Sequence, residues 1–344
     1  MQVKTTRRLA WLALPLTLAL VAGACGGDDD DDSTGSKGDD SSQDLSGKSV
    51  SVTGSSTVAP ISEIVAEDFG AETDAKVTVD DPGTGDGFKE FCKGNADIAD
   101  SSRQIKDEEK AECDKAGITY TELKIGFDGL TVMTNPNNDK VECLNFADLY
   151  ALISPKAEGF KKWSDGQTLA TQLGSKTELP DETLDLTGPG KESGTYDSFL
   201  EIALKGYAEE QGTDEKAART DYKASADDNT ILTNVESADF SLGWVGFAYA
   251  DQAGDSVKIL EVAKDNGTDC VAPSADTIQS GDYPLSRSLY IYVDNAKAKA
   301  NPAVKGYVDF YLDGLTDYVE EADYVALPDD QVSETQSTWD GAGV

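Results

Sequence analysis

The chain has 344 residues, of which 65 are acidic and 29 basic, giving a net charge of −36 at pH 7. This excess of negative charge argues against nucleic acid or an anionic membrane surface as a partner. The sequence contains no histidine, which excludes Ser-His-Asp and Cys-His nucleophiles and imidazole metal ligands. Catalysis by other groups stays open, but we expect a protein that is not an enzyme and that holds no metal or cofactor.

The first 24 residues have the pattern of a secretory signal. Lys4, Arg7 and Arg8 precede the apolar run LAWLALPLTLALV, and three small residues precede Cys25. The run is shorter than the ~20 residues that span a bilayer, which argues against a membrane anchor. We expect cleavage before Cys25 and its acylation, hence an extracytoplasmic lipoprotein anchored to the cell membrane. The arginine pair leaves the general secretory and twin-arginine routes open.

Residues 25–46 contain eight aspartates and almost no apolar side chain. Such a segment cannot bury enough surface to fold, so we expect a disordered tether between the lipid and the folded body. Calcium capture by the five consecutive aspartates is the alternative, but neighbouring like charges usually repel and extend.

From residue 47 onward, short strand patterns alternate with helical ones. Strands are expected at 48–53, 75–80, 97–99, 118–123, 127–134, 183–187, 242–245, 257–260 and 289–293. Apolar residues at helical spacing lie between them at 61–69, 146–153, 196–203 and 304–311. This alternation predicts an α/β fold with largely parallel sheets, and the length predicts two domains.

Four strand-to-helix junctions share glycines and hydroxyl side chains. They contain Ser55, Ser56 and Thr57; Thr84; Ser102 and Arg103; and Ser193, Gly194 and Thr195. The first amides of a helix lack internal partners and carry partial positive charge, and hydroxyls add further donors, so this pattern favours anion binding. Ordinary helix caps and turns are the alternative for each junction taken alone.

Apart from Cys25 there are four cysteines, which in an exported protein indicates two disulfides with three possible connectivities. We favour Cys92 with Cys113, which flank one strand-like unit, and Cys143 with Cys270. A zinc site is disfavoured because the chain has no histidine and no CxxC pair.

Together with other segments, these motifs resemble the substrate-binding lipoproteins of the high-affinity phosphate ABC transporter. The quoted segments are GSSTVAP, GTGDGFKEFC, DSSRQIKDEE, YTELKIGFDGLTVMTNP, GPGKESGTYDSF, ADDNTIL, LGWVGFAYA, APSADTIQSGDYPLSR and DYVALPDD. The resemblance implies a type II-like periplasmic binding protein with two lobes, each a mixed sheet flanked by helices. Lobe 1 would comprise 47–125 and 286–344 and lobe 2 would comprise 126–285, with a two-segment hinge near 125–128 and 284–287.

The resemblance also implies a ligand and a partner. The nine junction residues named above would bind inorganic phosphate between the lobes, and the protein, expected to be a monomer, would deliver it to an ABC permease. Better-known members have an arginine where this chain has Pro189, so Arg103 would have to supply that charge. They have an aspartate where this chain has Ser102, which leaves Glu192 and Asp86 as candidates for the acid that accepts the proton of hydrogen phosphate.

Other functions stay open at this stage. The same fold can bind another oxyanion or serve as a phosphate sensor or surface interaction protein. A phosphate-ester hydrolase would need an oxyanion pocket of this kind, but the sequence shows no activated nucleophile.

Overall fold

The computed structural model describes residues 45–191, 193–214 and 217–344. These residues belong to one compact unit, Ser42–Val344. The expected signal peptide, Cys25 and nearly all of the expected tether lie outside the described residues. In the described part of the chain, no helix combines the length and the hydrophobicity that a membrane span requires.

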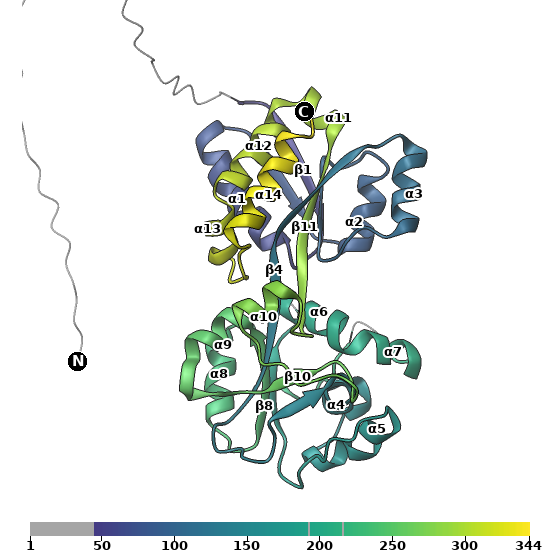
Figure 1. Cartoon of the computed structure of the whole chain (residues 1–344), viewed down its shortest axis with the longest axis vertical. Helices are drawn as coiled ribbons and strands as arrows, with labels where there is room; N and C mark the ends of the chain where they lie inside the picture. Colours follow the sequence, from purple (N-terminus) through teal and green to yellow (C-terminus); the bar gives the residue numbers. More distant parts are fainter. Residues whose placement is uncertain (1–44, 192, 215–216) are drawn as a thin grey trace, which may run out of the picture. The chain divides into compact units, whose positions relative to one another are not determined.

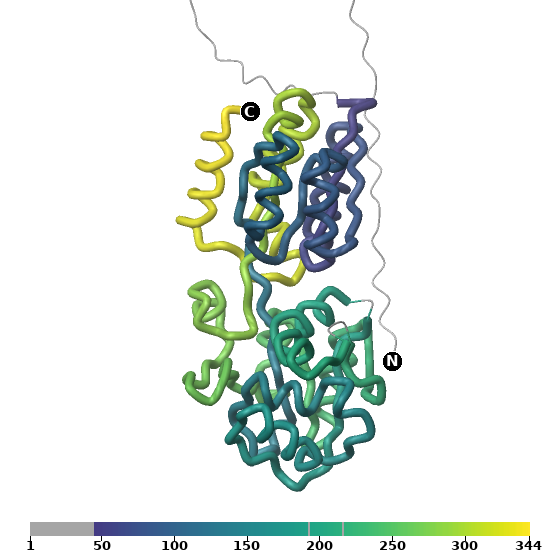
Figure 2. Tube along the Cα trace, turned by 90° about the vertical axis from the view of Figure 1, so that its right-hand side faces the viewer, coloured from purple at the N-terminus to yellow at the C-terminus, as the bar shows by residue number. Residues whose placement is uncertain are grey.

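Two halves of this unit are joined by two long strands, as Figures 1 and 2 show. The described strands of the first half are β1 (Ser49–Gly54), β2 (Lys76–Asp80), β3 (Ile98–Ser101), β4 (Tyr120–Thr134) and β11 (Ser286–Asp294). The second half contains β5 (Cys143–Asn145), β6 (Asp185–Pro189), β7 (Lys223–Ser225), β8 (Ser241–Gly246), β9 (Lys258–Ile259) and β10 (Glu261–Ala263).

The helices flank the sheet in each half (Figure 1). In the first half they are α1 (Ala59–Thr73), α2 (Thr84–Phe91), α3 (Asp107–Ala116), α11 (Asn295–Ala300), α12 (Pro302–Asp313), α13 (Leu315–Glu321) and α14 (Asp329–Asp340). In the second half they are α4 (Phe146–Ile153), α5 (Gln167–Gln172), α6 (Gly194–Phe199), α7 (Lys205–Gln211), α8 (Asp228–Glu236), α9 (Phe247–Ala253) and α10 (Ala275–Ser280). This arrangement confirms the predicted α/β class.

The main described sheet runs in the order β2-β1-β3-β11-β4-β8-β6-β7. The outer pairs β1–β2, β1–β3, β6–β7 and β6–β8 are parallel, whereas β11 and β4 run antiparallel to their neighbours. The sheet is therefore mixed, as expected for each lobe.

Strand β4 carries the chain from one half to the other. Its first part, from Tyr120 to Gly129, pairs with β11, and its second part, from Leu130 to Met133, pairs with β8. The sequence predicted two separate strands here, at 118–123 and 127–134. The structure has one continuous strand because β11 continues the ladder past Gly126. The change of partner after Gly129 lies close to the hinge that the family resemblance implies.

Helix α1 packs against the C-terminal helix α12 through apolar residues at helical spacing. Ile61, Val65 and Phe69 are buried, and the Phe69 ring meets the Tyr307 ring edge-on at 5.6 Å. Burial of such side chains contributes roughly 1.5–3 kcal/mol each. The packed face of α1 fixes the helix so that its first turn lies at the end of β1.

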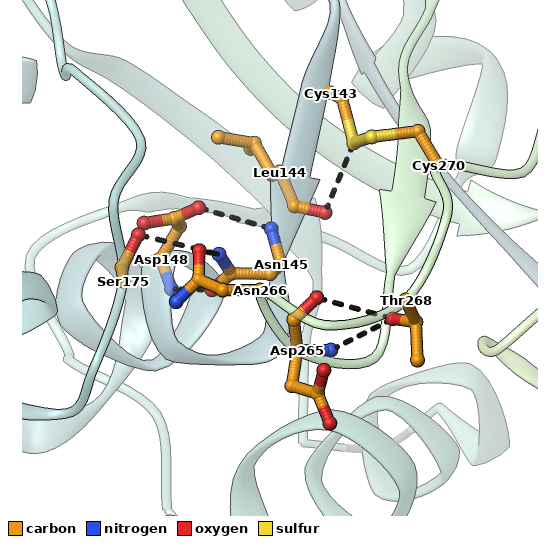
Figure 3. The surroundings of a disulfide bond; sticks show 9 residues. All are labelled: Cys143, Leu144, Asn145, Asp148, Ser175, Asp265, Asn266, Thr268 and Cys270. Atoms are coloured by element: carbon orange, nitrogen blue, oxygen red, sulfur yellow. Dashed lines mark hydrogen bonds between the residues drawn. A yellow bond between two sulfur atoms is a disulfide. The ribbon is translucent and has the colours of Figure 1, made fainter.

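Both disulfides join the expected partners. Cys92 is bonded to Cys113 within the first half, and Cys143 is bonded to Cys270 within the second half, beside the start of α4 (Figure 3). Neither bond links the two halves, so both leave β4 and β11 as the connection between them.

Candidate functional site

Two glycines allow the end of β1 to approach α2 closely. Gly54 has φ +148°, and a Cβ on it would lie 2.1 Å from the carbonyl oxygen of Asp100. A Cβ on Gly87 would lie 2.4 Å from Cα of Gly54. The glycines of the first two junctions therefore bring the loop Ser55–Thr57 next to the start of α2.

The hydroxyl groups at these junctions are not ordinary helix caps. The N-cap of α1 is Val58 and that of α2 is Gly83, and neither has a side-chain cap hydrogen bond. Ser193 is different, because its side chain accepts a hydrogen bond from the amide of Thr195 and so caps α6. The cap explanation thus holds for the fourth junction but not for the first two.

A small cavity lies where three of the junctions meet. Its volume is about 130 Å³, and it is lined by Ser55, Ser56, Thr57, Asp81, Pro82, Gly83, Thr84, Ser102, Asp197, Leu200 and Glu201. The side chains of Thr84 and Ser102 are both buried and share a hydrogen bond of 3.1 Å. The cavity is smaller than the ~300 Å³ typical of sites for drug-sized ligands, so it suits a small ion.

An arginine that the sequence analysis did not select stands beside this cavity. Nη2 of Arg287, near the start of β11, donates to Oγ1 of Thr57 at 2.8 Å and to Oγ of Ser198 at 2.6 Å. Its Nε donates to the buried carboxylate of Asp128 at 3.2 Å, and its Nη1 pairs with Glu201. One guanidinium therefore joins the α1 junction of the first half to α6 and the following turn of the second half.

Arg103, the expected source of positive charge, does not line the cavity. Both of its terminal nitrogens bond Glu109 at 2.8 Å, and its guanidinium lies 5.6 Å from the centre of the Phe88 ring. Burial alone would raise the pKa of Glu109, but hydrogen bonds from Arg103 and from the Lys106 amide outweigh it and lower that pKa. Both terminal nitrogens of Arg103 are thus engaged by a carboxylate six residues further along the chain.

The fourth junction lies next to the cavity rather than in its wall. Ser193, Gly194 and Thr195 line a neighbouring cavity of about 190 Å³. The two regions touch at Gly194, where a Cβ would lie 3.2 Å from the Ser56 carbonyl oxygen. Apart from Arg103, the predicted junction residues are thus brought together in two adjoining groups.

The neighbouring cavity also contains acidic side chains from both halves. Burial, reinforced by the nearby charge of Asp323, raises the pKa of Asp228 to about 6. Tyr249 donates to Asp323 at 2.9 Å, and this hydrogen bond together with burial raises the pKa of Tyr249 to about 12. Both cavities therefore carry acidic side chains, and the first differs in the buried hydroxyl groups of Ser55, Thr57, Thr84 and Ser102 that line it.

The acids of the first cavity differ from the two that the sequence suggested. Asp86 is 61% exposed and pairs with Lys89 at 2.7 Å, away from the cavity lining. Glu192 lies outside the described residues. The acids that line the cavity are Asp81, Asp197 and Glu201. Among them, the Asp197 carboxylate accepts a hydrogen bond of 3.1 Å from the Ser56 hydroxyl.

The residues that sequence reasoning missed had only weak local signals. Arg287 stands at the predicted second hinge crossing, but nothing in the sequence shows that it reaches Thr57, 230 residues away. Asp197 and Glu201 follow the SGT motif at helical spacing, but the local sequence does not show which carboxylates face the cavity.

Comparison with known proteins identifies the class to which this fold and site belong. A model of the PBP superfamily domain matches residues 33–314. A crystal structure of a possible phosphate-binding protein from Planctomyces limnophilus is similar, with a TM-score of 0.78 and 35% identity over 87% of this chain and 99% of that one. The chain belongs to the PBP superfamily of two-lobed substrate-binding proteins.

Two relatives of known name place the chain in a smaller family within this superfamily. The chain is 38% identical to protein SphX of Synechocystis sp. over 82% of this chain and 80% of the relative. It is 35% identical to the phosphate-binding protein PstS of Staphylococcus saprophyticus over 94% of this chain and 91% of the relative. Within the superfamily, the chain is a member of the PstS and SphX family.

Proposed function

We propose that this protein binds one inorganic phosphate ion in the small cavity and delivers it to an ABC-type permease. The observation that carries the proposal is the convergence of buried hydroxyl groups at the ends of β1 and β3 and at the start of α2. Hydroxyl donors and helix N-termini suit a small oxyanion. Family membership supports phosphate as that oxyanion.

The proposed ligand set departs from the set that the sequence suggested. Ser55, Ser56, Thr57, Thr84 and Ser102 remain in it, as the hydroxyl wall. Arg287 replaces Arg103 as the cation, because its guanidinium already bonds Thr57. Ser193, Gly194 and Thr195 stay as the adjoining group from the second half, whose contact with the ion requires the halves to approach further. The lobe limits 47–125 with 286–344, and 126–285, remain a proposal.

Asp197 is the proposed acceptor for the proton of hydrogen phosphate. It lines the cavity from the second half and lies within hydrogen-bond reach of Ser56. A carboxylate there accepts a hydrogen bond from protonated phosphate and repels fully ionised sulfate, which lacks that proton.

The remaining proposals concern location and partners. Residues 1–24 act as a signal peptide, Cys25 carries the lipid, and residues 25–46 tether a monomeric receptor to the outer face of the membrane. The protein then contacts the membrane through its lipid and through the permease. The protein performs no chemistry on phosphate, in keeping with its lack of histidine.

Calorimetric titration of the purified protein, stripped of carried ligand, with phosphate and with sulfate tests this function. The expected result is tight one-to-one binding of phosphate and none of sulfate. An Asp197→Asn variant should lose part of this selectivity, whereas Asp86→Asn should keep it. Binding of another oxyanion in preference to phosphate would favour the alternative function on the same fold, and silence with both ions would contradict the proposal.

A further inference from the structure

The carboxylate of Glu201 reaches the same guanidinium as the proposed ligand, that of Arg287. It follows α6 on a π-helical turn, Leu200–Leu204, lines the small cavity, and pairs with Nη1 of Arg287. Single π-turns occur often at functional sites because they re-aim one side chain of a helix. Here the turn places the Glu201 carboxylate beside Arg287, the cation that we propose for phosphate binding.

The two carboxylates that bond Arg287 have different environments. The side chain of Asp128 is 2% exposed and bonds Nε, whereas that of Glu201 is 51% exposed. Asp128 is therefore a fixed part of the arginine's surroundings. Glu201 has solvent on one side, so it can leave Nη1 and become hydrated at little cost.

We propose that Glu201 is an internal anion that competes with the bound oxyanion for Arg287. This inference rests on the proposed function. While Glu201 pairs with Nη1, its carboxylate occupies the position beside Arg287 that the negatively charged phosphate would take. A bound phosphate takes over the guanidinium and displaces Glu201 toward solvent. The competition lowers affinity, which gives the receptor a means of releasing a ligand that is otherwise enclosed by donors.

If Glu201 competes with phosphate, replacing it should increase phosphate affinity, whereas most substitutions in a binding site decrease it. Glu201→Gln removes the competing charge and should tighten phosphate binding by about fivefold, the effect of a partly exposed ion pair. The matched control is Glu209→Gln on α7, which removes the same charge from an exposed position and should change affinity less than about twofold because of screening. Both are measured by calorimetry beside the wild-type protein.

A second readout separates competition from proton acceptance. A competitor for Arg287 does not distinguish oxyanions, so Glu201→Gln should keep the wild-type preference for phosphate over sulfate. Weaker phosphate binding with a gain of sulfate binding would make Glu201 the proton acceptor and overturn the inference. Unchanged affinity, or equal gains in both glutamine variants, would overturn it as well. A wild-type protein that does not bind phosphate would instead refute the proposed function.

Discussion

At the scale of single residues, the geometry of Arg287 matters as much as its charge. Its three nitrogens reach Asp128, Glu201 and a pair of hydroxyl groups at once. A lysine has the same charge, but its three N–H donors share one nitrogen, so they cannot reach partners that are spread over the width of a guanidinium. Planar forked donors also match two oxygens of one oxyanion.

We therefore expect Arg287→Lys to weaken phosphate binding by about 10- to 100-fold, the loss of one or two charge-assisted hydrogen bonds. Arg103→Lys is the control, because Arg103 pairs with Glu109 outside the cavity, and it should change affinity less than about twofold. Calorimetry measures both, and circular dichroism checks that each variant is folded. Equal losses in the two variants would contradict the assignment of Arg287.

A second residue-scale prediction concerns Asp100 at the end of β3. Both of its carboxylate oxygens are buried, and the Ser62 hydroxyl beside them offsets only part of the cost of burying a charge. Burial raises the pKa of Asp100 to about 8, from a usual 3.8. The folded protein thus holds a proton that the unfolded chain releases at neutral pH.

This difference in proton binding makes the stability of the protein depend on pH. Between pH 4 and 8 the folded state binds the extra proton, so Asp100 makes the free energy of unfolding fall as the pH rises through that window. The Asp100→Asn variant lacks this slope, and its stability relative to wild type should rise by a few kcal/mol from pH 4 to pH 8. Urea unfolding at several pH values measures it, and parallel curves for the two proteins would contradict the prediction.

At the scale of elements, each half contains its own disulfide bond. The Cys92–Cys113 bond ties the end of α2 to α3 across 21 residues, and the Cys143–Cys270 bond closes a loop of 127. In the chain-entropy picture, closing a longer loop constrains the unfolded chain more. The second bond should therefore stabilise the fold more than the first.

Replacing the cysteines of one pair by serine is expected to lower the free energy of unfolding by about 3 kcal/mol for the short loop and about 5 kcal/mol for the long one. Phosphate affinity should change little in either variant, because none of the four cysteines lines the cavity. Denaturant titration gives the stabilities and calorimetry gives the affinities. A larger loss of stability from the short loop would reverse the expected order.

At the scale of the whole molecule, the dominant property is the net charge of −36. Like charges repel more strongly in the compact state than in the extended chain, so they destabilise the fold. Salt screens this repulsion, and the Debye length falls from ~30 Å at 0.01 M to ~8 Å at 0.15 M. The molecule should therefore be more stable in salt.

We expect the free energy of unfolding to rise as sodium chloride increases from 0.01 M to 0.15 M and beyond. Ligand-free protein is used, so that anion binding at the site does not contribute. Urea titrations at fixed salt concentrations measure the effect. A stability that stays constant or falls across this range would show that local ion pairs outweigh the repulsion.

Local patterns in the sequence predicted the α/β class, most of the described strands, the four helices with the clearest apolar period and the hydroxyl-rich junctions. These features depend on nearby residues, through the hydrophobic period and through glycine at a turn. The family motifs added the two-lobed fold. The local pattern predicted four of the hydroxyl residues because each lies in a loop that follows a predicted strand. These residues are Ser55, Thr57, Thr84 and Ser102.

Only the tertiary structure decided which charged groups face the cavity. Arg103 follows Ser102 directly, but Glu109 holds it outside, whereas Arg287 is distant in sequence and is brought to Thr57 by the pairing of β11 with β3 and β4. Asp197 and Glu201 meet the first half because the two long strands bring α6 to the α1 junction. The contacts of Arg287 with Thr57 and of Asp197 with Ser56 join residues 230 and 141 positions apart, and local sequence patterns carry no information about such contacts.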